Sequence, residues 1–337
     1  MLLRIYLYIF YQMFLLIATT SQKGLLNMSQ NYKQMYISNT LIYILDNKYI
    51  TSIIRSMRYT HAQFMKDFPD ENTCLDTIFQ ERYGDVTICP NCGVIDTKFY
   101  RVKGRKCYAC MHCGYQLHPL AETIFHKSST PLKSWFYAIY LFSVSKNGVA
   151  AKELERHLGV TYKTAHRMAR QIRSLMTATG SKISGNVEAD ETYIGGKTYS
   201  DRRFKNKTPI LGVVERKGEV RAKVVDGANA STALPFLRAN IEANSAIITD
   251  DSRIYNRLKR EYPHESVNHS QYEYVRGIIH TNTIEGFWGQ MKRSIDGTYH
   301  CVSPKYLQYY VNEFVFRYNL RGVVVYPALL ELAAKRV

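Results

Sequence analysis

Three acidic side chains of the sequence are candidates for metal chemistry. Asp190 lies in the predicted strand 186–194, and Asp250 closes a second apolar strand. Glu285 lies in a predicted helix that begins near Asn282. Acidic residues are uncommon in strands, and a carboxylate at the C-terminal end of a strand stands where α/β sheets bind ligands. Because Mg²⁺ and Mn²⁺ prefer carboxylate oxygens, Asp190, Asp250 and Glu285 are predicted to bind one of these ions.

The third position of this set is open. Asn282 and Glu285 are three residues apart and share one face of the predicted helix, and Lys292 follows two turns after Glu285. Two divalent ions held by such a set can bind the attacking and the leaving oxygen of an in-line phosphoryl transfer. The sequence therefore predicts an enzyme that breaks or exchanges phosphodiester bonds, with Glu285 or Asn282 as the third catalytic residue.

Two cysteine pairs predict a structural zinc site. Cys89-Pro-Asn-Cys92-Gly and Cys110-Met-His-Cys113-Gly are separated by the spacing that four-cysteine sites use. Four thiolates leave no open coordination position, so this zinc ion would be structural. Cys107 also forms a Cys-x-x-Cys pair with Cys110 and could replace Cys113 as a ligand. We prefer Cys113 because the second knuckle then ends in Cys-Gly, as the first does.

Residues 148–176 predict a helix-turn-helix. A first helix ends at Gly159, which suits a left-handed cap, and Thr161 can cap a second helix. Apolar residues are spaced to form a core between the two helices. The outer face of the second helix is basic, as expected of a helix that contacts DNA phosphates and base edges. Its candidate DNA-binding residues are Lys163, His166, Arg167 and Arg170.

The composition agrees with a protein that binds nucleic acid. The 337 residues include 45 Lys and Arg against 28 Asp and Glu, which gives a formal net charge of +17. Such an excess attracts polyanions, of which nucleic acid is the usual one. The 46% of hydrophobic residues exclude a disordered chain, and the length allows two or three domains. Clustered cysteines fit a reducing compartment, so we expect a cytoplasmic, nucleoid-associated protein, or a nuclear one in a eukaryotic host.

Residues 1–56 form an atypical N-terminal extension. A short basic start and an apolar run from Ile5 to Ile17 resemble a secretion signal, but the run is shorter than the roughly 20 residues of a membrane span. A secretion signal also conflicts with a thiolate metal site and a basic chain. The bias toward Ile, Tyr, Leu, Asn and Lys favours translated upstream sequence, with the working start near Met57. An ordinary extension is the remaining alternative, and no membrane partner is expected.

Together these motifs resemble the DDE-type insertion-sequence transposases of the ISXO2-like group, which carry an N-terminal zinc ribbon. The resemblance covers roughly residues 62–320, and residues 1–56 have no counterpart. It implies an α/β, RNase H-like catalytic domain that follows a zinc ribbon and a helix-turn-helix-like segment. The motifs that carry it are FPDE, CPNCG, TIFHKS, TPLKSWFYAIY, VEADETYIGGK, TDDSRIY, VNHSQYEYVRG and HTNTIEGFWGQMKRSIDGTYHCVSP.

The resemblance also implies roles for individual residues. Asp190 and Asp250 match the first two catalytic metal ligands, and Asp250 is preferred over its neighbour Asp251. The third position of the family is often described as Asn with a following Lys, so Asn282 and Glu285 both stay candidates. Lys292 matches the basic residue that contacts the transposon end. The zinc pair that matches is Cys110 and Cys113, which leaves Cys107 as an extra cysteine.

The implied function is Mg²⁺-dependent cleavage of double-stranded DNA at terminal inverted repeats, followed by strand transfer into target DNA. Such enzymes act on paired ends, so we expect a homo-oligomer. A catalytically inactive or domesticated DNA-binding protein is the first alternative, and a nuclease for structured DNA or RNA is the second. The predicted segments are the extension (1–56), a helical entry (57–85), the zinc ribbon (86–122), the helical DNA-binding segment (123–180), the catalytic domain (185–322) and a C-terminal tail (323–337).

Overall fold

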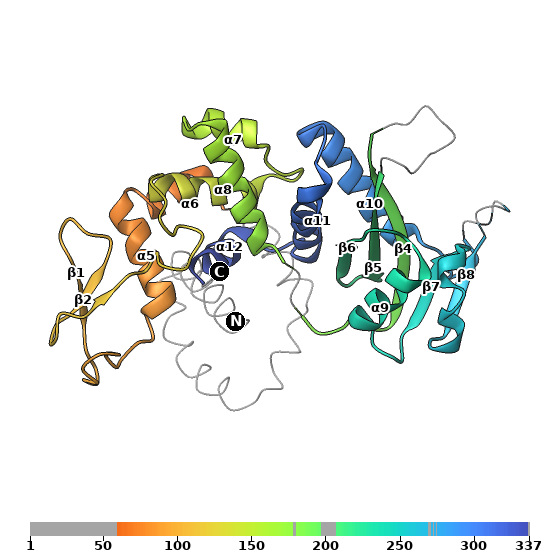
Figure 1. Cartoon of the computed structure of the whole chain (residues 1–337), viewed down its shortest axis with the longest axis horizontal. Coiled ribbons are helices and arrows are strands. Elements are labelled where there is room, and N and C mark those ends of the chain that lie inside the picture. Colours follow the sequence, from red (N-terminus) through yellow and green to blue (C-terminus); the bar gives the residue numbers. More distant parts are fainter. Residues whose placement is uncertain are drawn as a thin grey trace, which may run out of the picture. The chain divides into compact units, whose positions relative to one another are not determined.

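A computed structural model of the chain describes residues 59–177, 180–196, 207–268, 271, 273 and 275–335 (Figure 1). These residues belong to one unit, Arg58–Val337. The extension predicted at 1–56 and the start expected near Met57 lie outside the described residues. Among the helices that are described, none is both long and apolar enough to cross a membrane.

Glu71 links two helices of the N-terminal part through a polar contact. It opens α5 (Glu71–Tyr83), and its carboxylate accepts the backbone N–H groups of Leu132 and Lys133 at 2.9 Å each. These two residues begin α6 (Leu132–Val144). The first N–H groups of a helix have no hydrogen-bond acceptor within the helix, and a carboxylate near them interacts favourably with the helix dipole. Glu71 therefore caps α6 and holds it against α5, with the short α4 (His61–Asp67) ahead of them.

The predicted helix-turn-helix is present. Gly159 has a φ of 63° and ends α7 (Ala151–Leu158) with a left-handed cap. The hydroxyl of Thr161 accepts an N–H from the first turn of α8 (Tyr162–Leu175). Leu154 of α7 is fully buried in the core that both helices share with α5 and α6. The local signals in the sequence therefore placed both helix ends correctly.

The C-terminal segment differs from the tail that was expected at 323–337. Val325–Ala334 form α12, whose residues Tyr326, Leu329 and Ala333 are buried in the core of α5, α6 and α8. Spacings of three and four residues put these side chains on one helix face. The prediction of a tail was wrong because the partners of this apolar face lie far earlier in the chain and not in the neighbouring sequence.

The cysteine-rich segment forms a small antiparallel sheet beside α5. The ring of Tyr108 stacks on that of Phe79 in α5, with centroids 3.8 Å apart. Aromatic contacts of this kind bury a large apolar area at a defined geometry. They attach the sheet to the helical core. Its strands, paired in chain order, are β1 (Phe99–Arg101), β2 (Tyr108–Cys110) and β3 (Gln116–Leu117).

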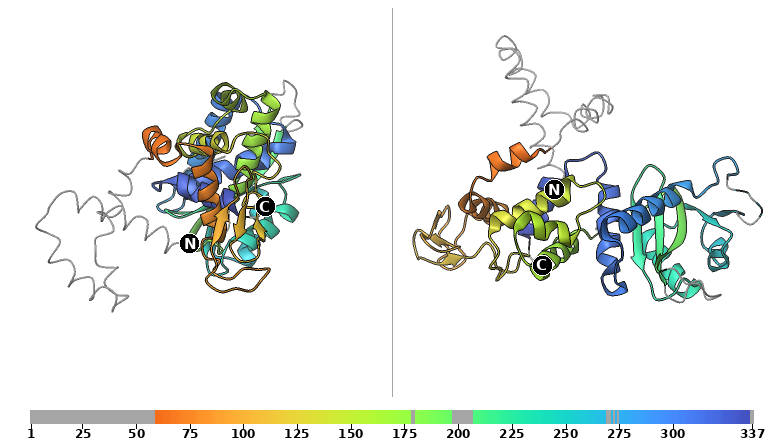
Figure 2. Two further views of the ribbon diagram at one scale, coloured as in Figure 1. Left: turned by 90° about the vertical axis from the view of Figure 1, so that its left-hand side faces the viewer. Right: turned by 90° about the horizontal axis from the view of Figure 1, so that it is seen from above.

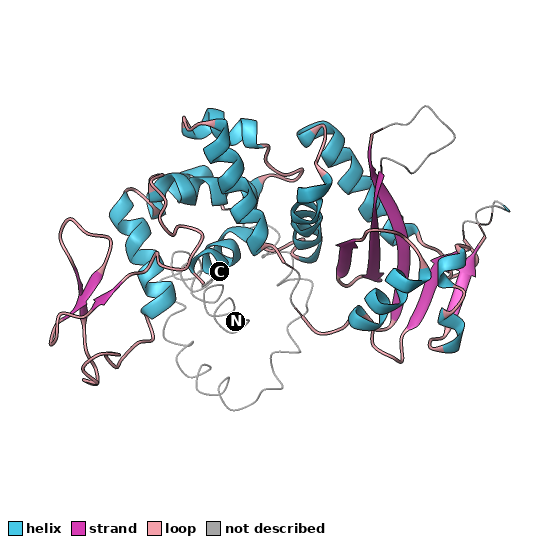
Figure 3. Cartoon of the chain, viewed as in Figure 1, coloured by secondary structure: helices cyan, strands magenta, loops and turns pink. Residues whose placement is uncertain are grey.

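A second, five-stranded mixed sheet contains the strands on which Asp190 and Asp250 lie. Its strands are magenta in Figure 3. Its central strand is antiparallel to one neighbour and parallel to the other. When the five strands are numbered along the chain, their spatial order across the sheet is 3-2-1-4-5. The α/β class expected of this part of the chain is thereby confirmed. From one edge to the other the strands are β6 (Val220–Val224), β5 (Lys207–Glu215), β4 (Asn186–Gly195), β7 (Ala246–Asp250) and β8 (His264–Val267).

Different helices cover the two faces of this sheet, and α10 runs along one of them (Figure 2). Val187 of β4 packs in the cluster that contains α9, whereas Ile210 and Val214 of β5 pack in the cluster of α10 and α11. Side chains alternate between faces along a strand, so Glu188 and Asp190 face α10. The helices and turns of this part are α9 (Ala230–Asn240), η2 (Arg253–Tyr255), η3 (Leu258–Arg260), α10 (Asn282–Ser294), η5 (Ile295–Tyr299) and α11 (Pro304–Asn319).

A buried ion network joins α8 to α11. Arg173 of α8 donates to the carboxylate of Glu313 at 2.7 Å, and both side chains are almost completely buried. Arg317 and the hydroxyl of Tyr299 donate to the same carboxylate. Burial alone would raise the pKa of Glu313, but the two arginines outweigh it and hold this pKa below its usual value. A buried charge needs such partners, so the network fixes the helix-turn-helix against the helix that packs on the sheet.

Candidate active site

The predicted acidic residues lie where the pairing between β4 and β7 stops. These strands are paired only as far as Glu188 and Ile248, after which β7 continues with β8. Asp190 on β4 and Asp250 on β7 both lie beyond this last pair. In α/β sheets, ligands bind beyond the C-terminal ends of neighbouring parallel strands. The structure thus brings the first two predicted catalytic residues together at the end of the sheet that usually carries a site.

Glu191 joins Asp190 and Asp250 in one close group of carboxylates. One oxygen atom from each of the three lies within 4.8 Å of the other two. The Tyr255 hydroxyl donates to Glu191 Oε2 at 2.9 Å, and the indole N–H of Trp288 donates to Asp190 Oδ2 at 3.1 Å. Two of the carboxylates are therefore oriented by neutral donors from elsewhere in the fold.

The electrostatics of this group favour a cation. Burial, followed by the charges of Asp250, Glu191 and Glu285, raises the pKa of Asp190 to about 8. Burial and the charge of Asp250 also raise the pKa of Glu191. Like charges that are held together and partly desolvated resist ionisation, and a divalent cation offsets their repulsion. A set of hard carboxylate oxygens fits Mg²⁺ or Mn²⁺ in particular.

Helix α10 carries both candidates for the third position. Glu285 is not a member of the close group, and one of its oxygens accepts a hydrogen bond from the hydroxyl of Thr281 at 2.6 Å. Its charge is nevertheless close enough to raise the pKa of Asp190. Asn282, in the first turn of α10, and Lys292, in the last, are both exposed. The charge of Glu285 therefore acts on Asp190, and Lys292 is exposed on the same helix.

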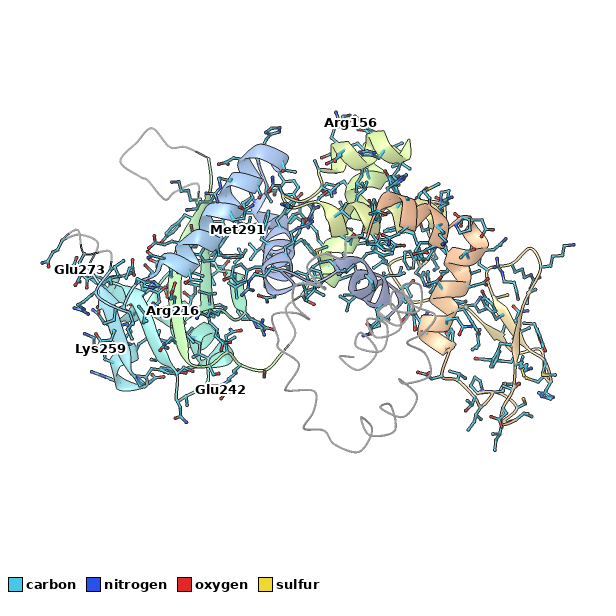
Figure 4. All side chains as sticks on the ribbon, turned by 180° about the vertical axis from the view of Figure 1, so that it is seen from behind. Arg156, Arg216, Glu242, Lys259, Glu273 and Met291 are labelled. Carbon is cyan, nitrogen blue, oxygen red and sulfur yellow. The ribbon has the colours of Figure 1, made fainter. Side chains whose placement is uncertain are left out.

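Glu188 lies next to the site but holds the start of α10 instead. It is completely buried, and it accepts the backbone N–H groups of Thr283 and Ile284 at 2.8 and 3.0 Å. Arg216, which lies beside the sheet (Figure 4), donates to Glu188 at 2.7 Å and also to the backbone carbonyl of His280. Of the acidic residues on β4, Asp190 and Glu191 thus belong to the carboxylate group, whereas Glu188 binds the positive end of the α10 dipole.

Glu188→Ala is expected to lower the free energy of unfolding by roughly 3–5 kcal/mol, because it leaves Arg216 without its partner and α10 without its cap. Urea denaturation followed by circular dichroism measures this loss. Glu265→Ala is the matched control, since its ion pair with Arg276 is exposed on both sides. That change should cost at most about 1 kcal/mol. Equal losses in the two variants would contradict the anchoring function of Glu188.

The four preferred thiols converge in the ribbon. Cys89 Sγ lies 3.7 Å from Cys113 Sγ, and Cys92 Sγ lies 4.0 Å from Cys110 Sγ. A tetrahedral ion with Zn–S bonds of about 2.3 Å separates its sulfur atoms by about 3.8 Å. The hydroxyl of Thr97 lies 3.3 Å from Cys110 Sγ, within reach to donate to the thiolate that a metal needs. The distances and the donor set therefore both fit a structural zinc ion.

Cys107 lies outside this group. It is buried, and its thiol donates to a side-chain oxygen of Gln116 at 3.4 Å. The two knuckles that do converge end in Gly93 and Gly114, with φ values of 68° and 73°. Only glycine adopts this left-handed backbone without strain. The repeated Cys-Gly ending was therefore a physical reason to prefer Cys113 over Cys107.

The predicted DNA-binding residues of α8 fall into two groups. Lys163 and Arg170 are exposed, as expected. His166 is half-buried, with its ring 5.4 Å from that of Tyr306 in α11. Arg167 is also half-buried and donates to the segment that precedes α6. The expectation that all four point outward does not hold, because distant segments of the chain cover one side of α8.

Two residues beside the predicted acidic site, Glu191 and Trp288, were not predicted from the sequence. Because side chains alternate along a strand, Glu191 would be expected on the face opposite to Asp190, but the pairing of β4 with β7 ends before both residues. Trp288 was not singled out, although it lies one helical turn after Glu285 and so on the same side of α10. That spacing was the only signal for it in the sequence.

Family models match two parts of the chain. Residues 182–319 match an ISXO2-like transposase domain, and residues 69–116 match a transposase zinc-ribbon domain. An uncharacterized protein in transposable element ISH50 of Halobacterium salinarum is 26% identical over 280 residues, which are 75% of this chain and 92% of that protein. An uncharacterized transposase-like protein of Haemophilus influenzae is 28% identical over 104 residues, which are 31% of this chain and 83% of that protein.

Two solved structures were also compared with the chain, each at a TM-score of 0.26. One is a simian T-cell lymphotropic virus intasome in complex with PP2A regulatory subunit B56 gamma; the match has 14% identity and covers 52% of this chain and 64% of that one, less than two thirds of its length. The other is a pre-cleavage Mos1 transpososome, with 11% identity over 59% of this chain and 77% of that one.

The two family matches include the residues that carry the site. The first contains the three clustered carboxylates and α10, and the second contains the four converging cysteines. Residues 182–319 are thus an ISXO2-like transposase domain, and residues 69–116 are a transposase zinc ribbon.

Proposed function

We propose that this chain is an active transposase, which binds double-stranded DNA at the terminal inverted repeats of an insertion sequence, cleaves it and joins the freed ends to target DNA. The observation that carries the proposal is the close group of Asp190, Glu191 and Asp250 at the end of a sheet. The chain has a net charge of +17, so the close packing of three acidic side chains at one place needs an explanation. Binding of a divalent metal ion that acts on a phosphodiester explains it.

In this proposal Asp190 and Asp250 hold Mg²⁺ or Mn²⁺, and Glu285 completes the set. The bound ions would lower the pKa of the attacking hydroxyl group and offset the charge of the reacting phosphate. The chain itself supplies rigid positions, because both aspartates lie on the sheet and Glu188 anchors the helix that carries Glu285. Each step breaks one phosphorus–oxygen bond and forms one, first with water and then with a DNA 3′-hydroxyl, so no covalent enzyme intermediate is needed.

DNA contacts are assigned to the exposed basic residues of two helices. Lys163 and Arg170 on α8 lie in the part with the helix-turn-helix, and Lys292 on α10 lies two turns beyond Glu285. Such side chains neutralise phosphates and give a binding affinity that falls as salt rises. The zinc ion in the ribbon is assigned a structural function. We expect at least two copies of the chain, so that each of two paired ends can occupy a site of its own.

The proposed function is tested with supercoiled plasmids that either contain or lack the inverted repeats that flank the gene. With Mg²⁺, the protein should produce 3′-hydroxyl ends at the outer edges of the repeats, and products in which those ends are joined to other DNA. Sequencing of the ends locates the breaks. Breaks that are spread equally over both plasmids would contradict a transposase and indicate a nuclease.

The third catalytic position is decided by a comparison of Glu285→Gln with Asn282→Ala. Glu285→Gln is expected to slow cleavage on the order of 10²-fold, because it removes a charge that acts on the metal-binding group. Asn282→Ala should slow it less than about tenfold. Single-turnover cleavage and Mn²⁺ titration calorimetry measure both effects. The reverse order of the two variants would assign the third position to Asn282.

A further inference from the structure

Trp288 forms a hydrogen bond directly with Asp190, the first of the predicted metal ligands. Its indole Nε1 donates to Asp190 Oδ2 at 3.1 Å. The side chain is only 3% exposed and packs beside Phe287, at 5.0 Å between ring centroids, on the face of α10 toward the sheet. An indole N–H can only donate, so it always takes up an acceptor lone pair. The contact therefore fixes which oxygen of Asp190 faces the protein.

Gly212 makes room for this contact on a separate strand. It lies on β5 directly opposite Asp190 in the sheet. A Cβ atom at this position would lie 2.4 and 2.5 Å from two carbon atoms of the Trp288 ring, and 3.3 Å from Ile284. The backbone φ of Gly212 is not in the left-handed region. A glycine inside a strand weakens it, and here only the close approach of the indole accounts for it.

We propose that Trp288 is the positioning residue of the first catalytic carboxylate, with Gly212 as the space that admits it. This inference rests on the proposed function of the metal site. The indole binds Oδ2 of Asp190 and so leaves Oδ1 as the oxygen presented to a metal. Partners behind a ligand fix its direction, and their loss typically weakens metal binding or activity 10- to 100-fold. Trp288 does not touch the substrate in this account; it acts through Asp190.

The chain has two tryptophans, which allows a spectroscopic test. Trp135 lies in the helical core, where its indole donates to Ser128 at 3.0 Å. In the zinc-loaded full chain with Trp135→Phe, all tryptophan emission comes from Trp288. Added Mn²⁺ should change this emission saturably, with the midpoint that titration calorimetry gives for Mn²⁺ binding. The change should disappear when Asp190→Asn is added. Emission that does not respond while Mn²⁺ binds would overturn the inference.

The second measurement uses Trp288→Phe, which keeps an aromatic ring and removes the donor. Its affinity for Mn²⁺ should fall about tenfold or more, and kcat for cleavage should fall with it, while KM for end DNA stays within about twofold. Gly212→Ala should lower the Mn²⁺ affinity in the same direction, because its Cβ displaces the indole. Trp135→Phe is the matched control and should keep the wild-type affinity.

The outcomes separate this inference from the proposed function. If the wild-type chain binds Mn²⁺ and cleaves end DNA, and a folded Trp288→Phe variant does both equally well, only the positioning function is overturned. If the wild-type chain binds no Mn²⁺ at the carboxylates, the proposed function fails and the inference fails with it. If Trp288→Phe does not fold, the emission of the intact Trp288 in the Trp135→Phe chain still decides.

Discussion

Asp190→Asn is expected to lower the rate of DNA cleavage by on the order of 10³-fold or more. The substitution keeps the shape of the side chain but removes the charge of one of the three clustered carboxylates. Metal ions contribute several kcal/mol to a phosphoryl transfer, and each 1.36 kcal/mol corresponds to about a factor of ten in rate. The rate of formation of 3′-hydroxyl ends on inverted-repeat DNA, in Mg²⁺ and in Mn²⁺, measures the effect.

Asp251→Asn is the matched control for this result. Asp251 directly follows Asp250 but is exposed and outside the close group of carboxylates. The Asp251→Asn variant should cleave DNA at a rate within about threefold of the wild-type rate, as expected for a surface substitution. Both variants should bind inverted-repeat DNA as the wild type does. Equal cleavage by Asp190→Asn and the wild-type chain would remove Asp190 from the catalytic set.

The positions of Asp190 and Asp250 could be predicted because their signals are local. An acidic residue in an apolar strand, and another at the end of a strand, stand out without knowledge of the fold. The functions of Glu188 and Glu191 are not local in this sense. The function of Glu188 depends on the helix whose first N–H groups it accepts, and that of Glu191 depends on where the pairing between β4 and β7 ends. Both depend on contacts between residues that are far apart in the sequence.

The same distinction explains the helical part. The end of α7 at Gly159 and the start of α8 after Thr161 depend only on neighbouring residues, and both were predicted. The burial of α12 and the half-burial of His166 need partners from other parts of the chain, and neither was predicted. Local chemistry thus located the elements, whereas the orientation of their faces followed from tertiary packing.

The cysteines are an intermediate case, because local spacing left two ligand sets open. Both sets contain Cys89, Cys92 and Cys110, so only the fourth position distinguishes them. The structure places Cys113 in the close group and turns Cys107 to a different partner. Two variants that differ only in which of these cysteines is replaced therefore form the sharpest test of the ribbon.

Cys113→Ser is expected to abolish zinc binding and unfold the ribbon, whereas Cys107→Ser should keep one zinc ion per chain. Metal binding supplies roughly 10–16 kcal/mol to small zinc domains, far more than a three-stranded sheet of this size can gain from its core. Elemental analysis gives the zinc content, and limited proteolysis between residues 86 and 122 reports the folding of the ribbon.

The stability of the rest of the chain is expected to survive the loss of zinc. The ribbon contributes few side chains to the helical core, chiefly Tyr108 and Leu117, and none to the clusters on either face of the five-stranded sheet. The Mn²⁺ affinity of Cys113→Ser should therefore stay at the wild-type value. Zinc retained by Cys113→Ser and lost by Cys107→Ser would instead favour Cys107 as the fourth ligand.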